Sequence, residues 1–173
     1  MKVLHVYKTY FPDSVGGIEQ VIRQLALSTP QYGVETVVLT LSSKEGERVI
    51  KIDNYYIHRA RSVFEIASTP FSASAFFMFK KLAQEADIIH YHFPFPFADL
   101  LHFLTRLNKP TVLTYHSDIV KQQNLLRLYR PLMNKFLGSV DCIVATVNGG
   151  SIFGWANDGK VLKILSEVGI KCN

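Results

Sequence analysis

A short apolar run near the start of the chain leads through two glycines into an amphipathic helical pattern. The run covers Lys2 to Tyr7 and has the composition of a buried parallel strand. After Gly16 and Gly17, apolar residues recur at helical spacing, at positions 18, 21, 22, 25 and 26. A strand, a glycine turn and a helix in this order predict the opening unit of an α/β fold.

The same unit predicts a binding site for an anion. Gly16 and Gly17 carry no Cβ, so the backbone can turn sharply there and come close to a ligand. The first N–H groups of a helix have no partners within it and attract negative charge, phosphate above all. A second interpretation is that the glycines serve only the turn. The flanking strand and helix favour the phosphate site.

Strand and helix signals alternate along the rest of the chain. Two short strands at 48–53 and 55–61 flank Asp53-Asn54 and predict a hairpin or one bent edge strand, whereas 62–70 is predicted to be a loop. The other predicted elements are strands at 34–41, 86–91, 110–115 and 141–146, and helices at 71–85, 97–107 and 119–137. The alternation predicts a Rossmann-like, doubly wound, mainly parallel sheet with helices on both faces. Ligands of such sheets bind at the carboxyl ends of the strands.

Four segments, in order, resemble the N-terminal domain of the retaining glycosyltransferases of family 4. They are KVLHVY with Phe11-Pro12 and Gly-Gly-Ile-Glu at 16–19, then DIIHYHFP at 87–94, KPTVLTYHSD at 109–118 and SVDCIVAT at 139–146. The resemblance covers roughly residues 1–146. It implies one half of the GT-B fold, in which two Rossmann-like domains face each other.

The resemblance also implies roles for residues at the predicted strand ends. Gly16 and Gly17 would approach the distal phosphate of a nucleotide-sugar donor. His116, directly after a predicted strand, would be the catalytic residue beside the donor sugar. Apart from the resemblance, four further residues are expected to line the crevice or to contact the acceptor, namely His92, Ser117, Asp118 and Lys121. The other interpretation of His116 is a loop histidine bonded to backbone.

Taken together, these roles imply transfer of a sugar, with retention, from a nucleotide-sugar donor to a glycan or lipid-linked precursor of a cell-surface polysaccharide. Bacterial O-antigen or exopolysaccharide assembly would fit. No cofactor and no metal are implied, and the expected partners are the donor and the acceptor. Which sugar, nucleotide or acceptor is used does not follow from these residues.

The half of the fold that normally holds the donor is not recognisable in this chain. Its signature in the family is a glutamate, seven residues and a second glutamate, and the carboxylates after Asp118 are Asp141, Asp158 and Glu167. Residues 147–173 instead begin with a glycine-rich stretch and end in a short helical pattern. We therefore expect a glycosyltransferase N-terminal domain at 1–146, a divergent tail, no donor-binding domain, and no activity of the isolated chain.

Two other classes of function stay open. One is a non-catalytic α/β module that binds a phosphorylated ligand or a partner protein. The other is a metal-dependent hydrolase built on His90, His92 and His116. His90 and His92 alternate onto the same face of a predicted strand, which suits metal binding. Because no third ligand follows at a recognisable spacing, a packed His90 and a crevice-lining His92 are favoured.

Charge and composition narrow the location and the partners. The net charge of +5 fits an anionic substrate or a membrane surface and is too small to indicate nucleic acid. Two cysteines, no signal-peptide pattern and no apolar run of membrane-spanning length predict a cytoplasmic protein. Four aromatic residues precede Lys80 and Lys81, namely Phe71, Phe76, Phe77 and Phe79. They fit either core packing, which is favoured, or peripheral contact with a membrane.

Overall fold

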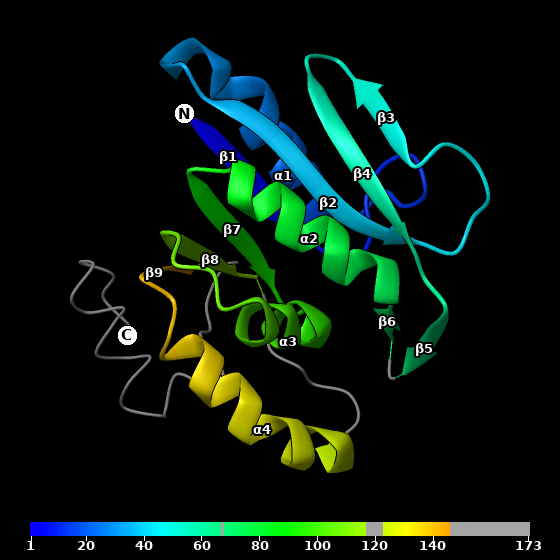
Figure 1. Ribbon diagram of the computed structural model, residues 1–173, viewed down its shortest axis with the longest axis vertical. Coiled ribbons are helices and arrows are strands. Elements are labelled where there is room, and N and C mark those ends of the chain that lie inside the picture. The colour runs from blue at the N-terminus through cyan, green and yellow to red at the C-terminus, as the bar shows by residue number, and fades with distance from the viewer. Residues whose placement is uncertain (67, 117–122, 146–173) are drawn as a thin grey trace.

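A computed structural model of the chain describes residues 1–66, 68–116 and 123–145. Its centre is a seven-stranded sheet with the order β3-β4-β2-β1-β7-β8-β9 (Figure 1). All neighbouring strands in this sheet are parallel except β3 and β4. The predicted fold class, a Rossmann-like and mainly parallel α/β sheet, is confirmed.

The first half of the chain builds one side of the sheet. Its elements are β1 (Lys2–Val6), α1 (Gly17–Ser28), a short 3₁₀ helix (Pro30–Tyr32), β2 (Glu35–Ser42), β3 (Val49–Ile52) and β4 (Tyr55–Arg61). Strands β3 and β4 pair antiparallel around Asp53 and Asn54, as predicted, because a two-residue connection can only reverse the chain.

The second half extends the sheet from the opposite side of β1. Its elements are β5 (Phe64–Ile66), β6 (Thr69–Phe71), α2 (Ala73–Glu85), β7 (Ile88–Phe93), α3 (Pro96–Thr105), β8 (Thr111–Tyr115), α4 (Gln123–Leu137) and β9 (Cys142–Ala145). The strand order therefore reverses between β1 and β7. In an open α/β sheet such a switch point opens a crevice at the carboxyl ends of the strands.

Each face of the sheet has its own apolar core. The larger core joins the strands to α2, α3 and α4, through residues such as Phe79, Leu101 and Phe136. The smaller core lies under α1, where Ile22 and Ala26 pack with the opposite-facing side chains of β2 and β4. Helices thus cover both faces, and α1 lies on the other side of the sheet from α2 (Figure 1).

One segment differs from the prediction. Residues 62–70 were expected to form a loop, yet β5 and β6 pair there as a separate antiparallel hairpin. Each strand has only three residues, too few for an alternating pattern to be recognised. The hairpin is held by an aromatic stack between Phe64 and Phe71, whose ring centroids lie 5.2 Å apart. The predicted tail at 147–173 lies outside the described residues.

Candidate functional site

The predicted site residues that the structure describes lie along the carboxyl edge of the sheet. Gly16 and Gly17 begin α1 at the end of the loop that follows β1. His92 is the penultimate residue of β7, and His116 comes directly after β8. The backbone N–H of His116 donates to the carbonyl of Phe93, at 3.2 Å, which ties the two strand ends together. Ser117, Asp118 and Lys121 lie outside the described residues.

The buried side chain of Glu19 connects the start of α1 to the loop that precedes it. Although it belongs to the first turn of the helix, its side chain is buried and its Oε1 atom accepts two hydrogen bonds. The hydroxyls of Thr9 and Ser14 donate them, at 2.9 and 2.8 Å. This carboxylate therefore fixes the loop to the helix that follows it. The amphipathic pattern alone would have placed Glu19 among exposed polar residues.

The structure requires glycine at position 16 but not at position 17. A Cβ on Gly16 would lie 2.5 Å from Oε2 of Glu19, so any side chain there would displace the buried carboxylate. A Cβ on Gly17 would meet no atom within 4 Å, and its backbone is not in the left-handed region. Neither packing nor backbone conformation of the described residues therefore requires glycine at 17. Gly16 offers no side-chain cap to α1, so no side chain at this position satisfies any of the first N–H groups of the helix.

A buried ion pair anchors the same loop to the sheet. Arg59 on β4 is 5% exposed, and its Nη2 atom lies within 2.8 Å of both carboxylate oxygens of Asp13. Nη2 also donates to the hydroxyl of Ser42, and Nη1 donates to the carbonyl of Glu47. Burial alone would raise the pKa of Asp13, but the hydrogen bonds and the positive charge of Arg59 lower it on balance.

Four histidines gather where β1, β7 and β8 lie side by side. His5 and His90 occupy matching positions on neighbouring strands, and His92 follows on the same face of β7. Nδ1 of His5 lies 3.0 Å from Nε2 of His92, and Nδ1 of His92 lies 3.0 Å from Nε2 of His116. His90 contacts His92 ring to ring and shares a hydrogen bond with the hydroxyl of Thr114, at 2.7 Å.

Burial keeps these imidazoles neutral at pH 7. It lowers the pKa of His116 to about 4, and burial with the charge of His116 lowers that of His90 to about 4. The pKa values of His5 and His92 fall well below the usual 6.5, chiefly because both rings are buried. In addition, a positive charge on a neighbouring histidine would repel a proton on either ring. A neutral imidazole has one N–H donor and one acceptor nitrogen.

The histidine cluster bears on the metal-dependent hydrolase hypothesis. His5, His90 and His92 offer nitrogens that all lie within 4.8 Å of one another. The bonded rings of His5 and His92, however, face each other in line, with centroids 5.3 Å apart and only 21° between their planes. The two nitrogens of a tetrahedral zinc site lie about 3.3 Å apart, and their lone pairs converge on the metal from different directions rather than facing each other. The 3.0 Å spacing suits a hydrogen bond instead.

Paired carboxylates for hydrolysis are not found at Asp87 and Asp99. The carboxylate of Asp87 accepts the backbone N–H of Lys2 at the opposite end of β1, at 2.7 Å. Asp99 is buried in α3 and accepts the hydroxyl of Tyr129. Burial raises the pKa of Asp99 well above its usual value. These two acids therefore belong to separate structural contacts.

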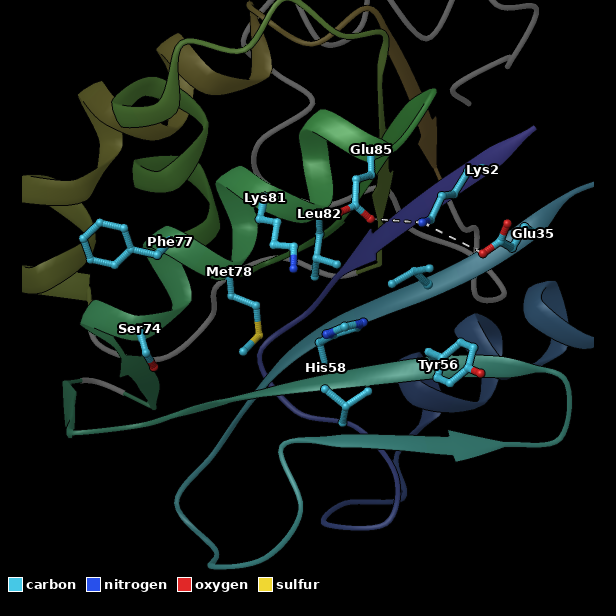
Figure 2. A pocket seen from close by; sticks show the side chains of 12 residues that line it. Lys2, Glu35, Tyr56, His58, Ser74, Phe77, Met78, Lys81, Leu82 and Glu85 are labelled. Atoms are coloured by element: carbon cyan, nitrogen blue, oxygen red, sulfur yellow. Dashed lines mark hydrogen bonds and ion pairs between the residues drawn. The ribbon is translucent and has the colours of Figure 1, made fainter.

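A groove of about 610 Å³ lies elsewhere, between α2 and the strands β2, β3 and β4. Phe77, Met78 and Lys81 line it from the helix, and Tyr56 and His58 line it from β4 (Figure 2). Phe79 is fully buried and Phe76 packs on the core, so most of the aromatic cluster of α2 serves packing. Phe77 is 72% exposed.

Three residues of the site were missed by sequence reasoning, namely His5, Glu19 and Arg59. His5 stands alone in an apolar run, and only the pairing of β1 with β7 places it beside His90. The parallel pairing of β2 with β4 likewise brings Arg59 next to the loop after β1. Within the described part of the chain, no helix is both long and apolar enough to cross a membrane.

Comparison with known proteins identifies the family of the chain. A sequence profile of Glycosyltransferase Family 4 matches residues 15–148. The D-rhamnosyltransferase WbpZ of Pseudomonas aeruginosa is 57% identical over 145 residues, and the O-antigen chain mannosyltransferase C of Escherichia coli is 51% identical over 146. Each alignment covers 84% of this chain but only 38% and 39% of these relatives. The chain thus spans about two fifths of their length.

Solved structures share the fold at low sequence identity. A sucrose-phosphate synthase from Thermosynechococcus elongatus superposes with a TM-score of 0.59 and 15% identity, over 82% of this chain and 41% of that one. A second chain of this synthase gives a TM-score of 0.57 and 13% identity, over 85% of this chain and 77% of that one. This likeness shows the Rossmann-like fold of GT-B glycosyltransferases.

Proposed function

The chain belongs to Glycosyltransferase Family 4, and on this premise we propose that residues 1–146 form the acceptor-side domain of a retaining glycosyltransferase. The sugar passes from a nucleotide donor to a glycan or lipid-linked precursor of a cell-surface polysaccharide. Relatives named for D-rhamnosyl and mannosyl transfer favour one of these sugars as the transferred group. The donor nucleotide is held by a second domain outside these residues.

One observation carries the proposal. The open start of α1 and the imidazole of His116 both lie on the carboxyl edge of the sheet, beside the switch point between β1 and β7. A phosphate at the helix start and a sugar beside the histidine would therefore lie at one crevice. This arrangement suits a ligand that carries a diphosphate and a sugar together.

Each group has a chemical part to play. As the sugar leaves its nucleotide, negative charge grows on the diphosphate, and the N–H groups and dipole of α1 at Gly17 stabilise it. The neutral His116 orients the donor sugar through Nδ1, the ring nitrogen not bonded to His92. Ser117, Asp118 and Lys121, which lie outside the described residues, stay predicted to line the acceptor side of the crevice.

A peripheral contact with the cytoplasmic membrane face is part of the proposal. The exposed ring of Phe77 lies on the same helix as the exposed Lys80 and Lys81. An aromatic ring beside lysines suits the headgroup region of an anionic membrane, where a lipid-linked acceptor would reside. Sedimentation with phosphatidylglycerol vesicles tests this contact, because Phe77→Ser should reduce binding and Tyr32→Ser, at another exposed aromatic residue, should not.

The transfer proposal can be tested in a chimera. The segment of WbpZ that aligns with this chain is replaced by the corresponding residues of this chain, and the chimera is assayed with the donor and acceptor of WbpZ. We expect transfer, and NMR of the product should show that the new glycosidic bond keeps the anomeric configuration of the donor. A folded chimera that binds the donor without transfer would favour the non-catalytic binding module instead.

A further inference from the structure

Three imidazoles form a continuous chain from the inside of the sheet to its carboxyl edge. His5 lies buried on the central strand β1, His92 lies buried on β7, and His116 follows β8 half-buried at the edge. Two N···N contacts of 3.0 Å join them, and each contact uses a different nitrogen of His92. The two hydrogen bonds therefore connect His5 to His116 through the ring of His92.

In each bonded pair, the two nitrogens lie on the line between the ring centroids, as expected for a straight hydrogen bond. In both pairs the ring centroids lie 5.3 Å apart and the planes differ by only 21°. The centroid separation exceeds the N···N distance by about one ring diameter, so the bonded nitrogens lie on the line that joins the two rings. A side-by-side or stacked arrangement would bring the centroids closer than this.

The tautomers of the three rings are coupled in such a chain. When His92 is neutral, it carries a proton on either Nδ1 or Nε2 but not on both. If Nδ1 carries it, His92 donates to His116 and must accept from His5. If Nε2 carries it, His92 donates to His5 and must accept from His116. The two hydrogen bonds therefore point the same way along the chain.

We propose that His5 and His92 are positioning residues that hold His116 in one orientation and one tautomer at the sugar site. The tautomer of His116 decides whether its remaining nitrogen, Nδ1, donates a hydrogen bond to the ligand or accepts one. We call the hydrogen-bonded chain His5–His92–His116 the relay. Its purpose rests on the proposed function, because that function assigns His116 to the donor sugar. The low pKa values of the three rings agree with it, because a neutral chain preserves this coupling at pH 7.

NMR of the 173-residue chain tests the relay without any substrate. In protein labelled with ¹⁵N at histidine, a hydrogen bond between two imidazoles transmits a scalar coupling between its nitrogens. We expect such couplings between His5 Nδ1 and His92 Nε2 and between His92 Nδ1 and His116 Nε2. We also expect His116 to show the ¹⁵N shifts of a single tautomer. Absence of both couplings in the folded wild-type chain would overturn the proposal.

Variants at His5 separate the relay from local packing. His5→Phe keeps a buried ring but removes the nitrogen that bonds His92, so the ¹⁵N shifts of His116 should move toward a mixture of tautomers. His5→Asn places an amide near the position of Nδ1 and should restore the single tautomer. His58→Phe, at a histidine on β4, serves as the control and should leave His116 unchanged. Identical His116 shifts in all three variants would overturn the relay.

Added Zn²⁺ distinguishes the relay from a metal site. We expect one equivalent of Zn²⁺ to leave the couplings intact, whereas stoichiometric zinc binding that abolishes them would replace the relay by a metal centre. The NMR result is also independent of transfer activity. If the relay is found but the chimera transfers no sugar, the proposed function falls. If transfer occurs but His5→Phe leaves the His116 shifts unchanged, the relay falls.

Discussion

Nη2 of Arg59 lies 2.7 Å from Oδ1 and 2.8 Å from Oδ2 of Asp13, joining strand β4 to the loop that precedes α1. The arginine is almost fully buried, and the carboxylate of Asp13 is only 13% exposed. Through this pair, β4 fixes the loop in front of the proposed phosphate site. A single substitution can therefore test how firmly the loop is held.

Arg59→Met should lower the free energy of unfolding by about 3 kcal/mol, since the largely buried carboxylate of Asp13 then keeps as cationic neighbour the exposed Lys44, at 3.9 Å. Urea denaturation provides the measurement. Arg61→Met is the matched control, because Arg61 lies two residues along the same strand and is exposed. The control should change stability by less than about 0.5 kcal/mol. Equal losses for the two variants would show that the Asp13 pair does not hold the loop.

Gly17→Val should remove transfer while leaving the fold intact. The Cβ of the new side chain would meet no atom within 4 Å and the backbone is not left-handed, so the stability change should stay below about 1 kcal/mol. It would occupy the space where a phosphate approaches the helix, and turnover in the chimera should fall about 10²-fold or more. Ala73→Val, at the exposed first residue of α2, is the control. Normal turnover of Gly17→Val would leave the glycines as turn residues only.

Stability should fall as the pH is lowered from about 6.5 to about 4. In this window the unfolded chain binds protons on its histidines, while the folded chain, with lowered pKa values at His5, His90, His92 and His116, does not. Each such histidine contributes about 1.4 kcal/mol per pH unit. Asp13 and Asp141, whose pKa values are also lowered, lose their contribution mainly below this window.

Urea unfolding at several pH values measures this dependence. Because the unfolded state binds more protons, the free energy of unfolding should rise with pH across the window. His92→Gln should reduce the slope, since one protonation site is removed from the unfolded chain. A wild-type slope near zero between pH 4 and 6.5 would mean that the buried histidines protonate as freely in the folded chain as in the unfolded one.

Much of the fold followed from local sequence patterns. The alternation of strand and helix signals predicted the order of the main elements, and the polar pair Asp53-Asn54 predicted the β3–β4 hairpin. Gly16, Gly17, His92 and His116 were placed at one edge because each follows or ends a predicted strand. The hairpin of β5 and β6 was missed because three-residue strands carry almost no periodic signal.

The contacts that complete the site could not be predicted in the same way. His5 and His92 lie 87 residues apart, and they meet only because β1 pairs with β7 rather than with another strand. The residues around His5 in the run KVLHVY do not indicate whether this histidine bonds to another histidine or is simply a polar residue within an apolar strand. Glu19 and Arg59 are similar cases, since their burial depends on how the loop after β1 folds back over the sheet.

The 173-residue chain alone should show no appreciable sugar transfer. A diphosphate held from one side only loses most of the positioning that accelerates the reaction. Incubation with sugar nucleotides of the mannosyl and D-rhamnosyl classes, followed by chromatography of the products, provides the measurement. Turnover near 1 s⁻¹ or faster, which is typical of enzymes, would mean that this chain builds a complete donor site.

The most direct measurement of the proposed site is the turnover of the WbpZ chimera carrying His116→Ala, compared with the unsubstituted chimera and with His58→Ala. We predict that His116→Ala lowers turnover by about 10²-fold or more with an unchanged melting temperature, because the sugar loses its positioning partner at the carboxyl edge. His58→Ala, away from that edge, should keep full turnover. Full turnover of the folded His116→Ala chimera would contradict the assignment of the reaction to this edge of the sheet.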